Sequence, residues 1–324
     1  MTPLQFETQY QAEWDELQSL LSKLRVSARK SDAPIQGERL ASLYRRACEQ
    51  LALARARSYP AHIVDRLNQL TSDAHQVIYQ QQEIGLGRLR RLVAVDFPCA
   101  VRAHAPYVLI ATAVFLVPLI TLGLLVYYNP ELILSMVDAG TAAEFESMYS
   151  DVSESIGRRR DAGSDWAMFG YYIQHNIGLG FQCFASGLFA GVGSLFFLAF
   201  NGAFFGAIGG YLTERGLSSN FYSFVVTHGA FELTAIVLAG AAGLRIGHAL
   251  ISPGRRTRRD SLVVAARESI VIVYGVAGLL LIAAAVEAFW SSARWIPLPI
   301  KYGVAAACWI VVIGYLWRQG RHAS

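Results

Sequence analysis

Charged residues are scarce in this chain of 324 residues: Asp, Glu, Lys and Arg together make up 16% of it. Soluble domains average about 25% charged residues, so the composition favours a protein embedded in lipid. The few charges are unevenly spread, because residues 1–92 hold 13 of the 28 Lys and Arg and 10 of the 24 Asp and Glu. The net charge of +4 comes from short basic clusters beside apolar runs, a pattern typical of membrane topology and not of nucleic-acid binding.

The chain also lacks recognisable catalytic and metal-binding motifs. Its four cysteines, Cys48, Cys99, Cys183 and Cys308, fall in no CxxC or zinc-like spacing and are interpreted as packing residues. No HExxH, GxSxG or P-loop pattern occurs. We therefore expect no catalytic residue, no metal ion and no cofactor. The first residues form no apolar signal segment, which predicts that they stay in the cytoplasm.

Residues 1–92 have the pattern of a soluble helical domain. Apolar residues recur three or four apart over 5–30, 37–58 and the stretch after Pro60. Three such helices can bury one another as a cytoplasmic bundle. The alternative is that each helix lies on a membrane or on a partner. The segment 93–105 is expected to form a basic juxtamembrane connection. Topogenic or headgroup-contacting arginines precede it at Arg88, Arg90 and Arg91.

Residues 106–318 are predicted to form a membrane domain. The predicted spans are 106–128, 175–191, 194–213, 222–250, 264–290 and 299–317. Residues 129–170 carry eight acids and are expected to form a periplasmic loop. A cytoplasmic basic cluster is expected at Arg255, Arg256, Arg258 and Arg259.

An odd number of crossings must separate that loop from that cluster, so the apolar stretch 177–212 is divided in two. The hairpin is predicted at 191–193, with 201–202 as second choice and a re-entrant segment left open. The predicted fold is an all-α, polytopic membrane helix bundle of about six spans, with both termini cytoplasmic, joined to a soluble N-terminal helical domain.

Glycines are concentrated in the middle of the membrane domain. Those with helix-packing spacing are Gly187, Gly191, Gly202, Gly206, Gly210, Gly243 and Gly247. Small residues four apart allow close approach of helix backbones in lipid. We interpret them as internal packing, with a homodimer seam or a mobile helix pair as the alternative.

A polar site is predicted within the membrane. His228 and Glu232 share one face of a span, and Asn201 and Glu287 could approach the same region. Three interpretations stay open: a helix-locking hydrogen bond, a site for proton relay or transport, and two ligands of a metal completed by His175 or Glu287.

Three runs resemble the stage II sporulation protein M family. They are the FNG run at 200–202, the HGAFELTA run at 228–235 and the AGAAGL run at 239–244. The resemblance is specific over about 176–256, and the N-terminal helices look similar to an extension found in members outside spore formers. It implies a bacterial inner-membrane protein. In spore formers, the family member is a scaffold that assembles with two peptidoglycan-degrading proteins. The family's His-Gly-x-x-Glu pattern falls on His228, Gly229 and Glu232, with no chemical role attached.

The sequence therefore predicts a non-enzymatic scaffold or assembly component of a cell-envelope complex. The alternatives are a transporter or permease-like component and an intramembrane metallo-hydrolase. Expected partners are the lipid bilayer, unidentified envelope proteins and a second copy of the chain, with a dimer favoured. No nucleic-acid partner is expected.

Overall fold

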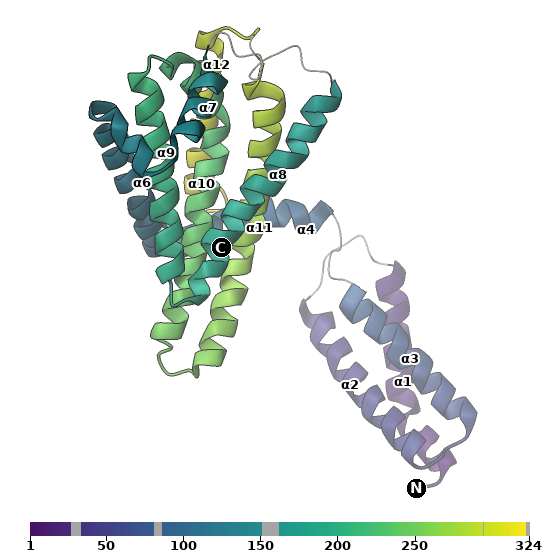
Figure 1. Cartoon of the computed structure of the whole chain (residues 1–324). Helices are drawn as coiled ribbons and strands as arrows, with labels where there is room; N and C mark the ends of the chain where they lie inside the picture. The colour runs from purple at the N-terminus through teal and green to yellow at the C-terminus, as the bar shows by residue number, and fades with distance from the viewer. Residues whose placement is uncertain (27–33, 81–85, 151–161, 294, 322–324) are drawn as a thin grey trace. The chain divides into compact units, whose positions relative to one another are not determined.

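The computed structural model describes residues 1–26, 34–80, 86–150, 162–293 and 295–321, and these residues form helices and turns with no strand. The predicted all-α class is therefore confirmed. The chain divides into two compact units, Met1–Arg90 and Arg91–Ser324. Each unit has its own buried apolar core, so each is described separately (Figure 1).

The N-terminal unit packs three helices around one core: α1 (Pro3–Val26), α2 (Pro34–Ala56) and α3 (Ala61–Gln80). The largest side chains of that core are Phe6, Trp14, Leu17, Leu43, Ile63 and Leu67. Those that share a helix lie three, four or eight residues apart, so the helix turns one apolar stripe inward. A short helix, α4 (Leu86–Arg91), follows, and its arginines Arg88, Arg90 and Arg91 are exposed.

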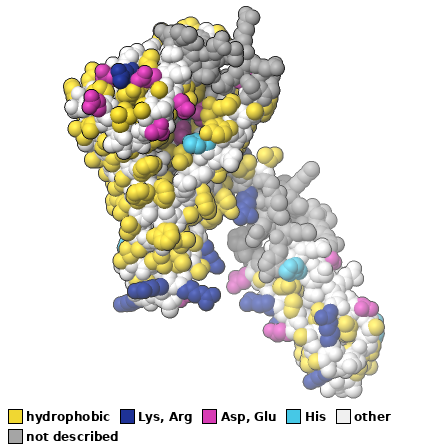
Figure 2. Space-filling view, viewed as in Figure 1, with side chains coloured by type: hydrophobic (Ala, Val, Ile, Leu, Met, Phe, Trp, Pro, Cys, Tyr) yellow, Lys and Arg dark blue, Asp and Glu magenta, His cyan; other side chains and the backbone are white. Residues whose placement is uncertain are grey.

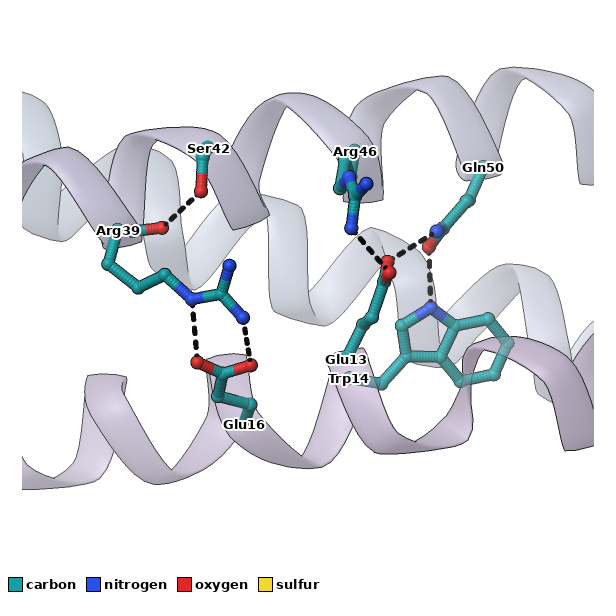
Figure 3. Close-up of polar contacts among 7 residues, drawn as sticks. All are labelled: Glu13, Trp14, Glu16, Arg39, Ser42, Arg46 and Gln50. Atoms are coloured by element: carbon teal, nitrogen blue, oxygen red, sulfur yellow. Dashed lines mark hydrogen bonds and ion pairs between the residues drawn. The ribbon is translucent and has the colours of Figure 1, made fainter.

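A polar seam joins α1 to α2 in this unit (Figure 3). The buried indole Nε1 of Trp14 donates to Gln50 Oε1 at 2.7 Å, and Gln50 Nε2 donates to Glu13 Oε2 at 3.1 Å. Nearer the start of α2, Arg39 makes a two-pronged contact with Glu16 at 2.7 and 2.6 Å. The hydrogen bond from Arg39, with its positive charge, lowers the pKa of the Glu16 carboxyl. The seam fixes which faces of α1 and α2 meet.

The second unit consists mainly of long apolar helices. Its main helices are α6 (Ala105–Tyr128), α7 (Ala139–Tyr149), α8 (Ala162–Ala185), α9 (Val192–Glu214), α10 (Ser218–Ile251), α11 (Arg258–Val286) and α12 (Leu298–Arg318). A π-helical turn, η4 (Glu287–Ser291), extends α11. Among the described residues, five helices are long and apolar enough to cross a membrane: α6, α9, α10, α11 with η4, and α12. The chain is thus a membrane protein.

Helix α8 differs from the span predicted at 175–191. It begins at Ala162, inside the predicted loop 129–170, and ends at Ala185 before a short 3-10 turn, η3 (Ser186–Leu188). It carries Asp165, Gln174 and Asn176, and α8 is not among the five helices apolar enough to span. The predicted span therefore overlaps α8 only over residues 175–185. The chain then reverses into α9 through Gly191, whose φ of +82° favours glycine.

Helix α10 is the centre of the membrane unit. It packs against α6, α8, α9, α11 and α12. Of the residues in its most apolar 18-residue stretch, 72% are buried. The surrounding helices turn apolar side chains outward, and Figure 2 shows them as a hydrophobic belt on the face in view. Lys and Arg side chains gather at the end where α10 joins α11 (Figures 1 and 2). Arg255, Arg256, Arg258 and Arg259 are all exposed there.

Glycines on one face of α9 bring its backbone against α6. They are Gly202, Gly206 and Gly210. A Cβ added to Gly206 would lie well inside 3.0 Å of the Leu119 carbonyl oxygen, and the other two glycines face the carbonyls of Phe115 and Gly123 in the same way. Side chains four residues apart lie on one helix face, so the contact repeats at every turn. These glycines serve packing inside the chain.

The other four predicted packing glycines join the α8–α9 turn to α10. Gly187 lies against the backbone of Gly243, and Gly191 lies against Gly247. The segment before α6 also packs onto the bundle as helix α5 (Phe97–Ala103). Its Arg102 donates to the carbonyl of Leu316 in α12 at 2.9 Å. Residues 97–103 of the predicted juxtamembrane segment are thus a packed helix, and the two ends of the membrane unit lie together.

Candidate polar site in the membrane unit

Helix α10 carries two buried ionisable side chains on one face. His228 is 4% exposed and Glu232 is 7% exposed, and the imidazole Nε2 lies 3.8 Å from the carboxylate Oε2. Residues four apart on a helix stack on the same face, which is why this pair meets. Groups of this kind are costly inside a bilayer and normally face the protein interior, as both do here.

The π-helical turn η4 brings two more polar groups to this pair. Its first residue is Glu287 and its last is Ser291. Ser291 Oγ lies 3.0 Å from His228 Nδ1. One ligand atom from each of His228, Glu232 and Glu287 lies within 4.8 Å of the other two. π-Turns are rare and are often found at functional sites, because the extra residue changes where the side chains point.

Two carboxylates at this separation need a neutralising partner. At an effective dielectric constant of 20, two like charges 4.8 Å apart repel by about 3 kcal/mol. The carboxylates of Glu232 and Glu287 come from different helices, so their repulsion would push α10 and α11 apart. A bound proton or cation between them would remove that repulsion.

Two further helices, α8 and α12, and one more residue of α10 surround the cluster. The buried amide of Asn176, on α8, lies against Glu287, but its Nδ2 makes no hydrogen bond of ordinary geometry. Lys301, on α12, is 5% exposed and donates from Nζ to the backbone oxygen of Ser291 at 2.9 Å. The ring of Phe224 meets the His228 imidazole edge to face at 5.3 Å. The His228 ring is therefore held in one orientation.

A cavity of about 320 Å³ lies next to the cluster, on the side of α7. Ser291 and Lys301 belong to its wall, and the exposed side chains Met148 and Leu298 place it at the protein surface. Tyr149, also on the wall, is buried; burial and the nearby Glu287 carboxylate raise the pKa of its phenol. We refer to this space as the α7 cavity.

The predicted site residues are only partly brought together. Glu287 joins His228 and Glu232, as expected from its place near the end of its span. Asn201 does not join them: its Nδ2 donates to the Phe197 oxygen of its own helix at 2.7 Å, and its other close partner is Cys183. His175, the other ligand considered, is exposed and stacks on Tyr171.

The sequence analysis missed Asn176, Ser291 and Lys301. No local motif marks them, since a serine or lysine next to apolar residues is common at the ends of spans. The signal that could have identified Asn176 is its place four residues before Gly180 on the apolar side of α8. Ser291 could have been found as the residue one turn after Glu287. Both inferences require knowing which helices are neighbours.

The chemistry of this cluster is acid–base and ligand chemistry. It offers an imidazole nitrogen, two carboxylates, a hydroxyl and an amide, mostly from α10 and η4. These groups can hold a helix pair together, bind a cation or hold a proton. None of the described side chains there is a cysteine, and the Ser291 hydroxyl is already engaged with His228.

Two family models match the chain. The model described as Stage II sporulation protein M covers residues 111–292, more than half of the chain and including His228, Glu232 and Glu287. A second model, described as Domain of unknown function (DUF8413), covers residues 4–80, which are most of the N-terminal unit. No curated protein matched the chain, and no solved structure did.

Proposed function

The chain belongs to the stage II sporulation protein M family, and on that premise we propose that it is a non-enzymatic assembly component of a bacterial cell-envelope complex. It would act in the inner membrane by holding partner proteins together. The N-terminal unit and the segment around α7 would serve as the contact surfaces on opposite sides of the membrane.

The observation that carries this proposal is the closed packing below the polar cluster. Along the face of α10 that bears His228 and Glu232, the next turns carry Ala235, Ala239 and Gly243. Ala235 is 0% exposed and Ala239 is 1% exposed, and Gly243 lies against the backbone of α8. A transport path needs space and polar groups through the whole membrane, whereas this face is packed in the apolar core at Ala235 and Ala239 and against backbone at Gly243.

The proposed orientation follows from the distribution of arginine. The α10–α11 connection, with Arg255 to Arg259, would lie in the cytoplasm, because short cytoplasmic loops carry an excess of Lys and Arg. Helix α7 and the α7 cavity would then face the periplasm. The turn between α8 and α9 packs against Gly243 and Gly247, near the arginine-rich end of α10, so α8 would be a sixth crossing despite its polar residues. With six crossings, and with Arg102 packed against the end of α12, both termini of the chain would be cytoplasmic.

We propose a homo-oligomer, with a dimer favoured, as the form that presents these surfaces. The glycines of α9 are already packed against α6, so they are not free to form the seam. The outward apolar faces of α6 and α12 would form the seam, because these two helices are the least buried of the five spans. Mass photometry in nanodiscs would show the mass of two chains; a single-chain mass at all protein concentrations would contradict the dimer.

Site-specific photo-crosslinking in cells tests the assembly role. A photoreactive residue at Leu4, 75% exposed on α1, reports on the cytoplasmic unit, and one at Met148, 39% exposed, reports on the α7 side. Leu281, 47% exposed on the outward face of α11 and so outside the proposed dimer seam, is the matched control. We expect discrete protein adducts from Leu4 or Met148 in the wild type, and weaker adducts in Glu232→Gln, because that variant loses assembly. Adducts with lipid alone at all three positions would contradict the proposal.

The α7 cavity favours transport as a second candidate function, because it leads from the surface to Ser291 and His228. In that case Glu232→Gln would leave folding and oligomeric state unchanged and abolish a measurable flux in proteoliposomes. The assembly role predicts the reverse: the variant loses assembly or yield, and no flux depends on it.

A further inference from the structure

We propose that His228, Glu232 and Glu287 form a binding site for one divalent transition-metal ion, with zinc the best-suited class. The three side chains supply an imidazole nitrogen and two carboxylate oxygens, all within 4.8 Å of one another. Nitrogen and oxygen donors of this kind are the ligands that zinc uses alongside cysteine. This inference does not depend on the assembly role, and it assigns no reaction to the ion.

The three ligand atoms need to move only slightly closer together to bind one ion. Ligand atoms about 2.0–2.1 Å from a tetrahedral ion are separated by about 3.3 Å. His228 Nε2 and Glu232 Oε2 already lie 3.8 Å apart. Rotation of the Glu232 and Glu287 side chains about their own bonds can shorten the remaining distances between ligand atoms, without moving α10 relative to η4. The donors come from two helices, so the ion would tie them together.

The imidazole is oriented as a metal-binding histidine should be. Its Nδ1 lies 3.0 Å from Ser291 Oγ, so Nδ1–H can donate to that oxygen while Nε2 keeps its lone pair directed at the carboxylates. The Lys301 Nζ bond to the Ser291 backbone oxygen fixes the same turn. The Phe224 ring then restricts rotation of the imidazole.

Charge and an unsatisfied neighbour also indicate a ligand. Two ionised carboxylates and a neutral imidazole carry a charge of −2. The buried Lys301 ammonium beside Ser291 offsets at most one of these charges, so a bound cation still lowers the electrostatic energy in a region of low dielectric constant. Asn176, 1% exposed, lies against Glu287, and its Nδ2 makes no hydrogen bond of ordinary geometry. Because the two ends of an amide are assigned by hydrogen bonding, Asn176 can turn its oxygen toward the ion or hydrogen-bond a ligating carboxylate.

The ion has a route of entry through the α7 cavity. Ser291 is shared between the cavity wall and the cluster. A metal site needs ligands, a second shell and an entry path, and the described residues supply all three.

The test is the metal content of tag-free protein by plasma mass spectrometry after growth with added zinc, manganese and iron. The variants are His228→Ala and Glu287→Gln. Glu268→Gln is the matched control, since Glu268 is a carboxylate on the same helix that pairs with Arg245 at 2.8 Å. We expect about one equivalent of metal per chain in the wild type and in the control, and at least a tenfold loss in both site variants.

A second measurement decides the question if the site variants fail to fold. Chelator-treated wild-type protein is titrated with Co²⁺, whose visible bands report coordination by nitrogen and oxygen donors, and then with Zn²⁺ as competitor. Saturation at one equivalent, with displacement by Zn²⁺, supports the site. Substoichiometric metal in the wild type together with a featureless Co²⁺ titration would overturn the proposal. Metal retained unchanged in folded His228→Ala and Glu287→Gln would overturn it too.

Discussion

Replacing Gly206 by alanine tests the contact between α6 and α9. The added Cβ would lie well inside 3.0 Å of the Leu119 carbonyl oxygen, and this neighbour is backbone, which cannot rotate away. Overpacking typically costs about 1–3 kcal/mol, and a clash with backbone lies in the upper part of that range, about 2–3 kcal/mol. The better helix propensity of alanine returns about 1 kcal/mol. The net expected loss is about 1–2 kcal/mol, or a fall in Tm of roughly 2–8 °C for a unit of this size.

The assay is thermal unfolding in detergent, followed by intrinsic fluorescence and by the loss of the monodisperse peak on size exclusion. Gly314→Ala in α12 is the matched control, because nothing lies within 4 Å of its added Cβ. It should be neutral or slightly stabilising. Gly202→Ala with Gly206→Ala should cost less than the sum of the two, because one separation of α6 from α9 relieves both clashes. An unchanged Tm for Gly206→Ala beside an unchanged control would refute the close packing.

Three smaller predictions concern the N-terminal unit and α7, which lie outside the spanning helices. Gln50→Leu leaves the buried Trp14 indole without an acceptor, and should cost about 1–3 kcal/mol, measured as faster amide hydrogen exchange in α1 and α2. The pKa of Glu16 is lowered by Arg39, so its contribution is present above the ordinary value of 4.5 and is lost as pH falls through the folded-state pKa. Amide exchange in α1 should thus accelerate on acidification, and Arg39→Met should reduce that pH dependence. Asp138 caps α7 by accepting from a backbone N–H at 3.0 Å, so Asp138→Ala should loosen α7 by about 1 kcal/mol, with exchange elsewhere unchanged.

The helices were largely predictable from the sequence because their causes are local. Apolar periodicity marked the core of the N-terminal unit, and long apolar runs marked the spans that became α6, α10 and α12. Helix α8 was harder, because it begins inside the acidic stretch 129–170 and the polar residues Gln174 and Asn176 interrupt its apolar residues. Hydropathy averages over all faces, whereas a helix packed against α10 and α11 needs only one apolar face.

The site was predictable only where its residues share a helix. His228 and Glu232 are four apart, so their meeting follows from helix geometry alone. Glu287 could be placed near them by depth, but Ser291 depends on the π-turn, which no sequence signal marked. Asn201 shows that a similar depth in the membrane does not place a residue in the site. Its amide donates to the Phe197 carbonyl one turn earlier in α9, an acceptor that the helix itself always provides.

The measurement that tests the assembly role most directly is the thiol accessibility of single cysteines in a variant with the four native cysteines replaced. Leu298→Cys, 41% exposed on the wall of the α7 cavity, should react with a membrane-impermeant reagent. Ala239→Cys, two turns beyond Glu232 on the closed face of α10, should stay protected when the reagent is applied to either side of the membrane. Reaction at both positions would reveal an aqueous path through the bundle and contradict the account.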